Sequence, residues 1–162
     1  MAGKTGNPPG KKMTGKIEKL VGKKTASIAI KLDKRTLAIW AADCAEHVLP
    51  YFEKEYPKDK RPRKAIKALR AWVRTGVFRM ADVRKASLDA HAAAREAEED
   101  SAARFAARAA GQAMATAHVF THAFGAAYYG AKAAEAAGAA SEREWQYRRL
   151  LRIKKKLGKR QE

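Results

Sequence analysis

The feature that most constrains this chain is an alanine-rich segment, residues 102–137, in which 17 of 36 residues are alanine. Alanine has the highest helix propensity and adds very little width to a helix. Gly111, Gly125 and Gly130 recur in this segment at spacings that place small residues on adjacent turns. Another helix must therefore approach the segment closely. We predict a long Ala-rich central helical segment over residues 102–137, with Gly111 and Gly125 facing a neighbouring helix.

The apolar content of the segment allows two interpretations. Residues 109–131 carry no formal charge over 23 positions, which is long enough to span a bilayer. However, the stretch includes Gln112, Thr116 and His118, and alanine contributes little transfer free energy. Hydrophobic residues make up 46% of the chain and 36 residues are alanine, so the core is built from thin side chains. The composition favours a buried helix in a soluble bundle over a transmembrane span.

Four other segments carry apolar residues at helical spacing. In the first of them Leu37, Trp40, Cys44 and Val48 fall on one side of a helix, and Pro57 ends it. The four predicted helices span residues 36–56, 62–76, 80–98 and 141–157. The sequence contains no strand pattern and no β-hairpin signal. We therefore predict an all-α, single-domain bundle of about five helices over residues 34–157.

The two ends of the chain have a different composition. Residues 1–35 carry ten basic and two acidic side chains and many glycines, with too little apolar surface to offset the entropy of ordering. We predict a flexible basic N-terminal tail over residues 1–33 and a short basic C-terminal tail over residues 158–162. The apolar run at residues 27–30 is too short for a secretory signal, so we expect a cytoplasmic protein.

The charge of the whole chain limits its function. It carries 35 Lys and Arg against 17 Asp and Glu, a net charge of +18, which exceeds what solubility requires. Such an excess favours acidic or polyanionic partners. The single cysteine, Cys44, excludes an intramolecular disulfide framework and a Cys-rich zinc site. Cys44 lies at the centre of an apolar stripe, which is typical of a small buried core residue rather than of a nucleophile.

Histidine and aspartate spacing suggests a metal site. His118 and His122 are four residues apart and point the same way on a helix, so both could bind one ion. The site could be completed by His91, or by Asp43 and His47, which have the same i, i+4 spacing. The alternative is a structural cluster at the edge of a thin core, in which one histidine hydrogen-bonds Asp43. We favour the structural alternative, and expect no metal and no cofactor.

Basic side chains gather on the faces of two predicted helices, the second and the last. These faces suit phosphate groups, an acidic protein surface or anionic lipid, because each needs only cations within reach. The alternative is a solvated helix face. The candidate residues for partner or polyanion binding are Arg63, Lys67, Arg70, Arg74, Trp145, Arg148, Arg149, Arg152 and Lys156.

Five strings, in order along residues 35–151, resemble one known family. They are LAIWAADCAEHVLPYFE at Leu37–Glu53, RPRKAIKALRAWV at Arg61–Val73, AHAAARE at Ala90–Glu96, RAAGQAMATAHVFTHAFGAAYYGAKA at Arg108–Ala133 and EREWQ at Glu142–Gln146. The chain resembles the small all-helical immunity proteins of polymorphic toxin systems. The resemblance implies an all-α fold, and a role in binding and neutralising a toxin rather than in catalysis.

The sequence thus leads to one main hypothesis and two alternatives. We expect a non-enzymatic helical protein that binds a partner protein, such as a cognate toxin with an acidic surface, and acts by occlusion. The first alternative is sequence-independent nucleic-acid binding through the basic faces and the tails. The second is a metal-dependent enzyme that uses Asp43, His91, His118 and His122.

Overall fold

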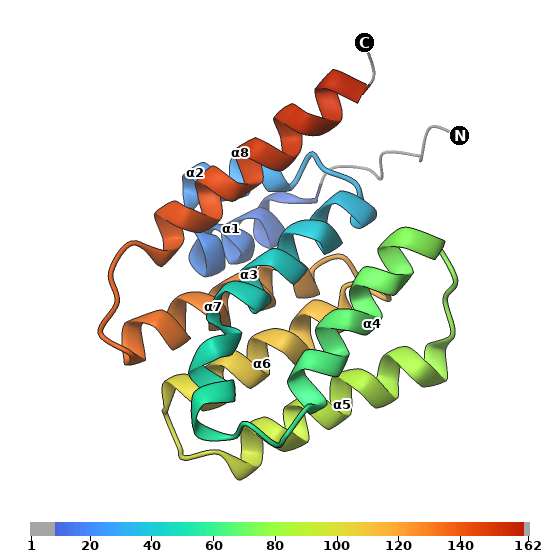
Figure 1. Ribbon diagram of the computed structural model, residues 1–162. Helices are drawn as coiled ribbons and strands as arrows, with labels where there is room; N and C mark the ends of the chain where they lie inside the picture. Colours follow the sequence, from blue (N-terminus) through green and yellow to red (C-terminus); the bar gives the residue numbers. More distant parts are fainter. Residues whose placement is uncertain (1–8, 161–162) are drawn as a thin grey trace.

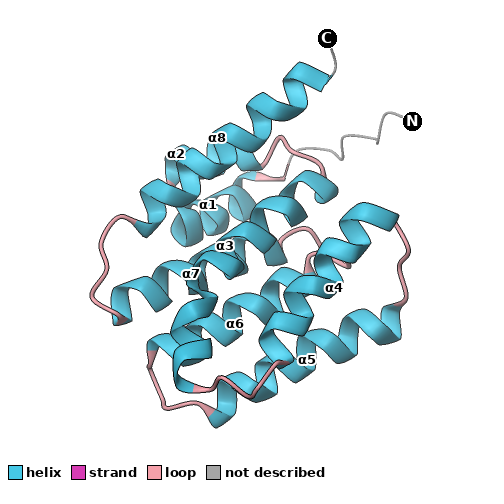
Figure 2. Cartoon of the chain, viewed as in Figure 1, coloured by secondary structure: helices cyan, strands magenta, loops and turns pink. Residues whose placement is uncertain are grey.

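The computed structural model describes residues 9–160, and this part of the chain is entirely helical, without strands (Figures 1 and 2). The all-α expectation is confirmed, but the expected number of about five helices is too low. The structure has eight helices in the described residues: α1 Lys11–Val21, α2 Lys23–Ala29, α3 Lys34–Glu55, α4 Arg61–Thr75, α5 Met80–Glu96, α6 Ala102–Ala115, α7 His122–Ala136 and α8 Glu142–Arg160.

Helix α6 is at the centre of the bundle. It packs against α3, α4, α5 and α7, and most of its alanines are fully buried. The large side chains of the core come mainly from α3, which buries Leu37, Trp40, Leu49 and Phe52, while α7 buries Phe124. The core is therefore a layer of bulky α3 side chains packed against alanine surfaces, as the composition predicts.

The Ala-rich segment is two helices, not one. The helix breaks after Ala115, where the N–H groups of Thr116, Ala117 and His118 donate to carbonyls three residues back, which tightens the last turn. After six residues α7 begins and packs along α6. The sequence could not locate this break because no proline and no glycine lies in residues 116–121. No helix within residues 9–160 is both long and apolar enough to cross a bilayer.

The N-terminal region differs from the predicted flexible tail. Residues 11–29 form α1 and α2, which bury Ile17, Val21, Ala26 and Ala29. Helix α1 packs against α7 and α2 packs against α8, and the Arg143 guanidinium donates to the carbonyl of Leu20 at 2.9 Å. The sequence did not predict these helices, because lysines and glycines interrupt the short apolar stripe that includes Ile17 and Val21. Residues 1–8 of the predicted tail lie outside the described residues.

The C-terminal end also differs from the prediction. Helix α8 continues to Arg160, so residues 158–160 are helical rather than a tail, while residues 161–162 lie outside the described part. Charged residues with high helix propensity extend the helix beyond its last buried residue, Ile153. The exposed last turns of α8 project past the body of the molecule in Figure 1.

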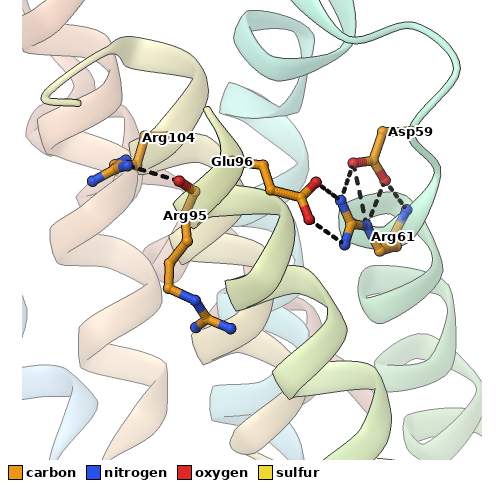
Figure 3. Close-up of polar contacts among 5 residues, drawn as sticks. All are labelled: Asp59, Arg61, Arg95, Glu96 and Arg104. Carbon is orange, nitrogen blue, oxygen red and sulfur yellow. Dashed lines mark hydrogen bonds and ion pairs between the residues drawn. The ribbon is translucent and has the colours of Figure 1, made fainter. Parts of the chain in front are cut away.

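Ion pairs join the loops at one end of the bundle (Figure 3). Arg61, at the start of α4, binds the carboxylates of Asp59 and of Glu96 at the end of α5. The hydrogen bond from Arg61 lowers the pKa of Asp59 below its ordinary value. Arg104 of α6 donates to the carbonyl of Arg95 at 2.9 Å, which ties the α5–α6 connection to α6.

Candidate functional site

A shallow cleft of about 300 Å³ lies where α3, α4 and α8 meet. Six side chains from these three helices line it: Asp43, Glu46 and His47 from α3, Arg70 from α4, and Trp145 and Arg149 from α8. The α3 residues lie at positions i, i+3 and i+4, so they share one face of their helix. We call these six residues the α3/α4/α8 cleft.

Asp43 holds the charged groups of the cleft in place. One carboxylate oxygen accepts from Arg70 Nη2 at 2.9 Å and the other accepts from Arg149 Nε at 2.8 Å. Only 9% of the Asp43 side chain is exposed, while Arg70 and Arg149 are about 40% exposed. Arg70 also binds the carboxylate of Glu46. Two guanidinium groups are thus fixed at the surface by a nearly buried carboxylate.

Two rings form the other wall of the cleft. His47 and Trp145 stack face to face, with ring centroids 3.7 Å apart and an interplanar angle of 2°. The Nδ1 of His47 lies 2.7 Å from a carboxylate oxygen of Glu142, which fixes the orientation of the imidazole. Trp145 is half-buried and His47 is exposed. The stack is therefore an ordered aromatic surface in contact with solvent.

Two buried hydrogen bonds hold α8 against the bundle at Gln146, next to Trp145. The indole N–H of Trp40 donates to the carbonyl of Gln146 at 2.9 Å, and the Gln146 amide donates to the carbonyl of Ala127 at 2.8 Å. These buried bonds attach α8 to α3 and α7. Cys44 is fully buried as expected, and burial, together with the charge of Asp43, raises the pKa of its thiol well above the ordinary value. A protonated, buried thiol is a core residue, not a nucleophile.

The candidate metal ligands make separate contacts. Asp43 binds arginines, so the expectation that a histidine hydrogen-bonds it is wrong. His91 Nδ1 accepts from Arg108 at 2.9 Å, His122 Nδ1 lies 2.8 Å from the side-chain oxygen of Gln112, and His118 stacks on Phe78. Within residues 9–160, no group of three or more His, Cys, Asp or Glu side chains could hold a metal ion.

The imidazole of His91 is part of the α5–α6 packing. Burial, and then the positive charge of Arg108, lower its pKa to about 4. Neutral His91 can accept the hydrogen bond from Arg108, whereas the protonated ring has no acceptor. Burial also lowers the pKa of His122. These histidines therefore make the structural contacts that the Ala-rich interior permits.

The nine predicted binding residues divide into three groups. Arg70, Trp145 and Arg149 meet in the cleft. Arg63 pairs with Glu53, and Arg148 pairs with Glu144 on its own helix. The others are exposed and form no ion pair in the described part of the chain: Lys67, Arg74, Arg152 and Lys156. Sequence reasoning missed Glu46 and Glu142, although the i, i+3, i+4 spacing of Asp43, Glu46 and His47 was a usable signal.

Comparison with known proteins identifies the family. A family model described as Imm-5 like putative immunity protein matches residues 28–153, which includes every residue of the cleft. No curated protein and no solved structure matches the chain. The matched range agrees with the resemblance found in residues 35–151. Since the match covers most of the 162 residues, the chain belongs to the Imm-5 like putative immunity protein family.

Proposed function

We propose that this protein has a non-enzymatic, immunity-type role, in which it binds a partner protein through the α3/α4/α8 cleft and blocks the partner's activity by occlusion. The family supports a protein partner. The observation that carries the proposal is the His47–Trp145 stack beside two arginines held by Asp43. Tryptophan and arginine are the residue types that most often dominate binding energy at protein interfaces.

The cleft is already ordered in the free protein. Glu142 orients His47, and Asp43 fixes the guanidinium groups of Arg70 and Arg149. Ordering a long side chain on binding costs about 0.5–1.5 kcal/mol, and these contacts remove part of that cost. A partner can then bury Trp145 and contact both guanidinium groups without rearranging the cleft.

The charge around the cleft favours an acidic partner. Seven lysines and arginines take part in the ion pairs of the described residues, out of 35 in the sequence. Lys67 and Arg74 lie on α4, and Arg152 and Lys156 lie on α8, all exposed. Carboxylates of a partner would meet these cations at the rim, where charges mainly raise the association rate.

Growth protection tests the proposal. The chain is co-expressed with the product of the gene directly upstream of its own gene, and we expect it to restore growth that this product inhibits. Trp145→Ala should abolish protection and weaken binding by at least about tenfold. Trp72→Ala is the matched control, because Trp72 is also half-buried but lies on α4 outside the cleft.

Three results would contradict the proposed function. The upstream product could be harmless, the chain could fail to bind it, or the two tryptophan variants could protect equally well.

The salt dependence of binding distinguishes protein binding from the nucleic-acid alternative. Binding to duplex DNA through Lys and Arg would fall by orders of magnitude between about 50 and 200 mM salt, whereas an interface anchored by Trp145 would weaken much less.

A further inference from the structure

A second surface lies at the loop between α4 and α5. Its exposed side chains are apolar, unlike the charged and aromatic side chains of the α3/α4/α8 cleft. This loop forms the right-hand edge of the molecule in Figure 1. Val77 is 62% exposed, and Phe78 and Met80 are each 41% exposed. Large apolar side chains with this much exposure are few in the described residues, and three of them lie within residues 77–80.

Neighbouring elements extend this exposed apolar surface. Phe78 stacks on His118, with ring centroids 6.2 Å apart, which brings the α6–α7 turn and its exposed Val119 to the loop. Leu88, which follows Met80 by about two turns of α5, is also exposed. We call Val77, Phe78, Met80, Leu88 and Val119 the apolar loop patch.

The loop has a defined conformation, so the exposure is not the result of a frayed end. Gly76 ends α4 with φ at 70°, in the left-handed region, and its N–H donates to the carbonyl of Trp72 at 2.7 Å. The N–H of Val77 donates to the Thr75 hydroxyl at 3.2 Å. These contacts turn the chain outward and present Val77 and Phe78 to solvent.

Exposed cations lie close to the patch in sequence. Arg74, Arg79 and Arg84 are exposed, and none of them pairs with a carboxylate in the described residues. Lys85 pairs with Asp89, four residues later. Asp82 is the remaining acidic side chain of this stretch. An apolar centre with unpaired arginines around it is complementary to a surface that is anionic outside and apolar beneath.

We propose that the apolar loop patch docks on an anionic lipid surface, with Val77, Phe78 and Met80 inserted among the headgroups and Arg74, Arg79 and Arg84 bound to lipid phosphates. A nucleic acid would satisfy the arginines but leave the apolar side chains in water. The patch lies on an outward loop and a helix face rather than in a groove. An extended bilayer surface also attracts the excess of +18 carried by the whole chain.

The geometry suits shallow insertion. Val77 and Phe78 project from a short loop between two helices whose arginines lie within a few residues, so the apolar groups and the cations can reach the same interface together. Shallow insertion of a few apolar side chains gives reversible attachment that depends on lipid charge. This inference does not depend on the partner-binding role of the α3/α4/α8 cleft, because the six cleft residues and the apolar loop patch have no residue in common. Arg74, which lies outside both sets, is the one cation that both proposals use.

Vesicle sedimentation tests the inference. The full chain is mixed with vesicles of phosphatidylcholine and phosphatidylglycerol at roughly 3:1, and with vesicles of phosphatidylcholine alone. We expect binding to the anionic vesicles only. The double variant Val77→Ser, Phe78→Ser should weaken that binding by about tenfold or more, because it removes the inserted groups and leaves the arginines unchanged.

The matched control is Leu151→Ser, because Leu151 is 38% exposed on α8 and has Arg148, Arg152 and Lys154 nearby in sequence. It should bind vesicles within about twofold of the unaltered chain. Thermal unfolding of each variant shows that the fold is retained. Failure of the unaltered chain to bind, or equal binding by the loop variant, would overturn the inference. The inference would also be overturned if the Val77→Ser, Phe78→Ser variant lost as much binding to duplex DNA, or to an acidic polypeptide, as it loses to anionic vesicles.

Discussion

Two regions of the bundle are held together in different ways. The first consists of α5, α6 and α7, and the second of α3, α4 and α8. In the first region, helices approach closely because the facing residues are alanine and glycine. The Ser87 hydroxyl of α5 donates to the carbonyl of Gly111 in α6 at 3.0 Å, and the His91 ring lies directly against Gly111. In the second region, Asp43 joins three helices through two arginines near the surface.

In the first region the helices are held together by close packing, and in the second they are joined by ion pairs. The helices approach closely at Gly111 and Gly125, so a larger side chain there has to displace its neighbours or change the distance between helices. The guanidinium groups paired with Asp43 lie at the surface, where water can replace a lost carboxylate partner. We therefore expect stability to depend strongly on small residues in the first region, and binding to depend mainly on side chains in the second.

The largest effect should come from Gly111→Leu. A Cβ at this position would lie 2.7 Å from His91 Nε2, and the whole ring would have to move within a partly buried contact. We expect a loss of about 3 kcal/mol in the free energy of unfolding, at the upper end of the usual cost of overpacking. Gly125→Leu should cost about 1–3 kcal/mol, because its nearest neighbour is the flexible side chain of Gln112.

Urea denaturation measures both variants, with Gly15→Ala as the control. Gly15 lies inside α1 and a Cβ there would meet nothing within 4 Å. Alanine at this helical position should stabilise the protein by up to about 1 kcal/mol. If Gly111→Leu were as stable as the unaltered chain, the close approach of α5 to α6 would not be a source of stability.

The next effect concerns Asp43→Asn. The amide can no longer neutralise Arg70 and Arg149, but both guanidinium groups are about 40% exposed and water can solvate them. We expect a loss of about 1–2 kcal/mol, less than for removal of one partner from a fully buried ion pair. Asp89→Asn is the control, since the exposed Lys85–Asp89 pair should contribute about 0.3 kcal/mol. Equal losses for the two variants would show that Asp43 is an ordinary surface residue.

The third effect is a pH dependence in the alanine region. The pKa of His91 is about 4 in the folded protein and about 6.5 in the unfolded chain, so the unfolded chain binds more protons between these values. Stability should therefore be fully present above about pH 6.5 and fall as the pH is lowered toward about 4. Because His91 is partly exposed, we expect a total loss of about 1–2 kcal/mol.

Unfolding free energies measured at about pH 7 and pH 5 check this dependence. Glu53 and Asp59 stay ionised over this range, because their arginine partners lower the pKa values of both carboxyl groups. His91→Gln should lose less stability than the unaltered chain between these two pH values. Arg108→Gln should also reduce the loss, because Arg108 contributes to the lowered pKa of His91. An unchanged slope in both variants would place the titrating group elsewhere.

The fold was predictable where bulky apolar residues recur at helical spacing. Leu37, Trp40, Cys44 and Val48 indicated α3, and all four are buried. The alanine segment gave no such guide, because alanine fits a helix equally well at every position and does not mark where the helix ends. The break at residues 116–121 is decided by the packing of α7 against α6, which is a tertiary effect.

The N-terminal helices show the same limit in another form. Ile17 and Val21 lie four residues apart, but lysines and glycines surround them and their burial depends on α7, more than a hundred residues later. The candidate site was partly predictable, because Arg70 and Arg149 lie on basic helix faces. Their common partner Asp43 was not, since the Asp43–Arg149 contact joins residues 106 positions apart.

The smallest effect should come from Arg148→Gln, compared with Arg149→Gln. These neighbours have the same charge and lie on the same helix. Arg148 is 72% exposed and donates to Glu144 at 3.2 Å, an i, i+4 contact that contributes about 0.3 kcal/mol. Arg149 binds Asp43, so its loss should reduce stability by about 1 kcal/mol and weaken partner binding. Unfolding and binding measurements on the two variants at low and high salt would show whether the Asp43 contacts differ from other surface pairs. Arg148→Gln and Arg149→Gln could instead reduce the free energy of unfolding and partner binding equally. The charged region would then act through its total charge rather than through the specific contacts of Asp43, and the two regions would differ only in how closely their helices pack.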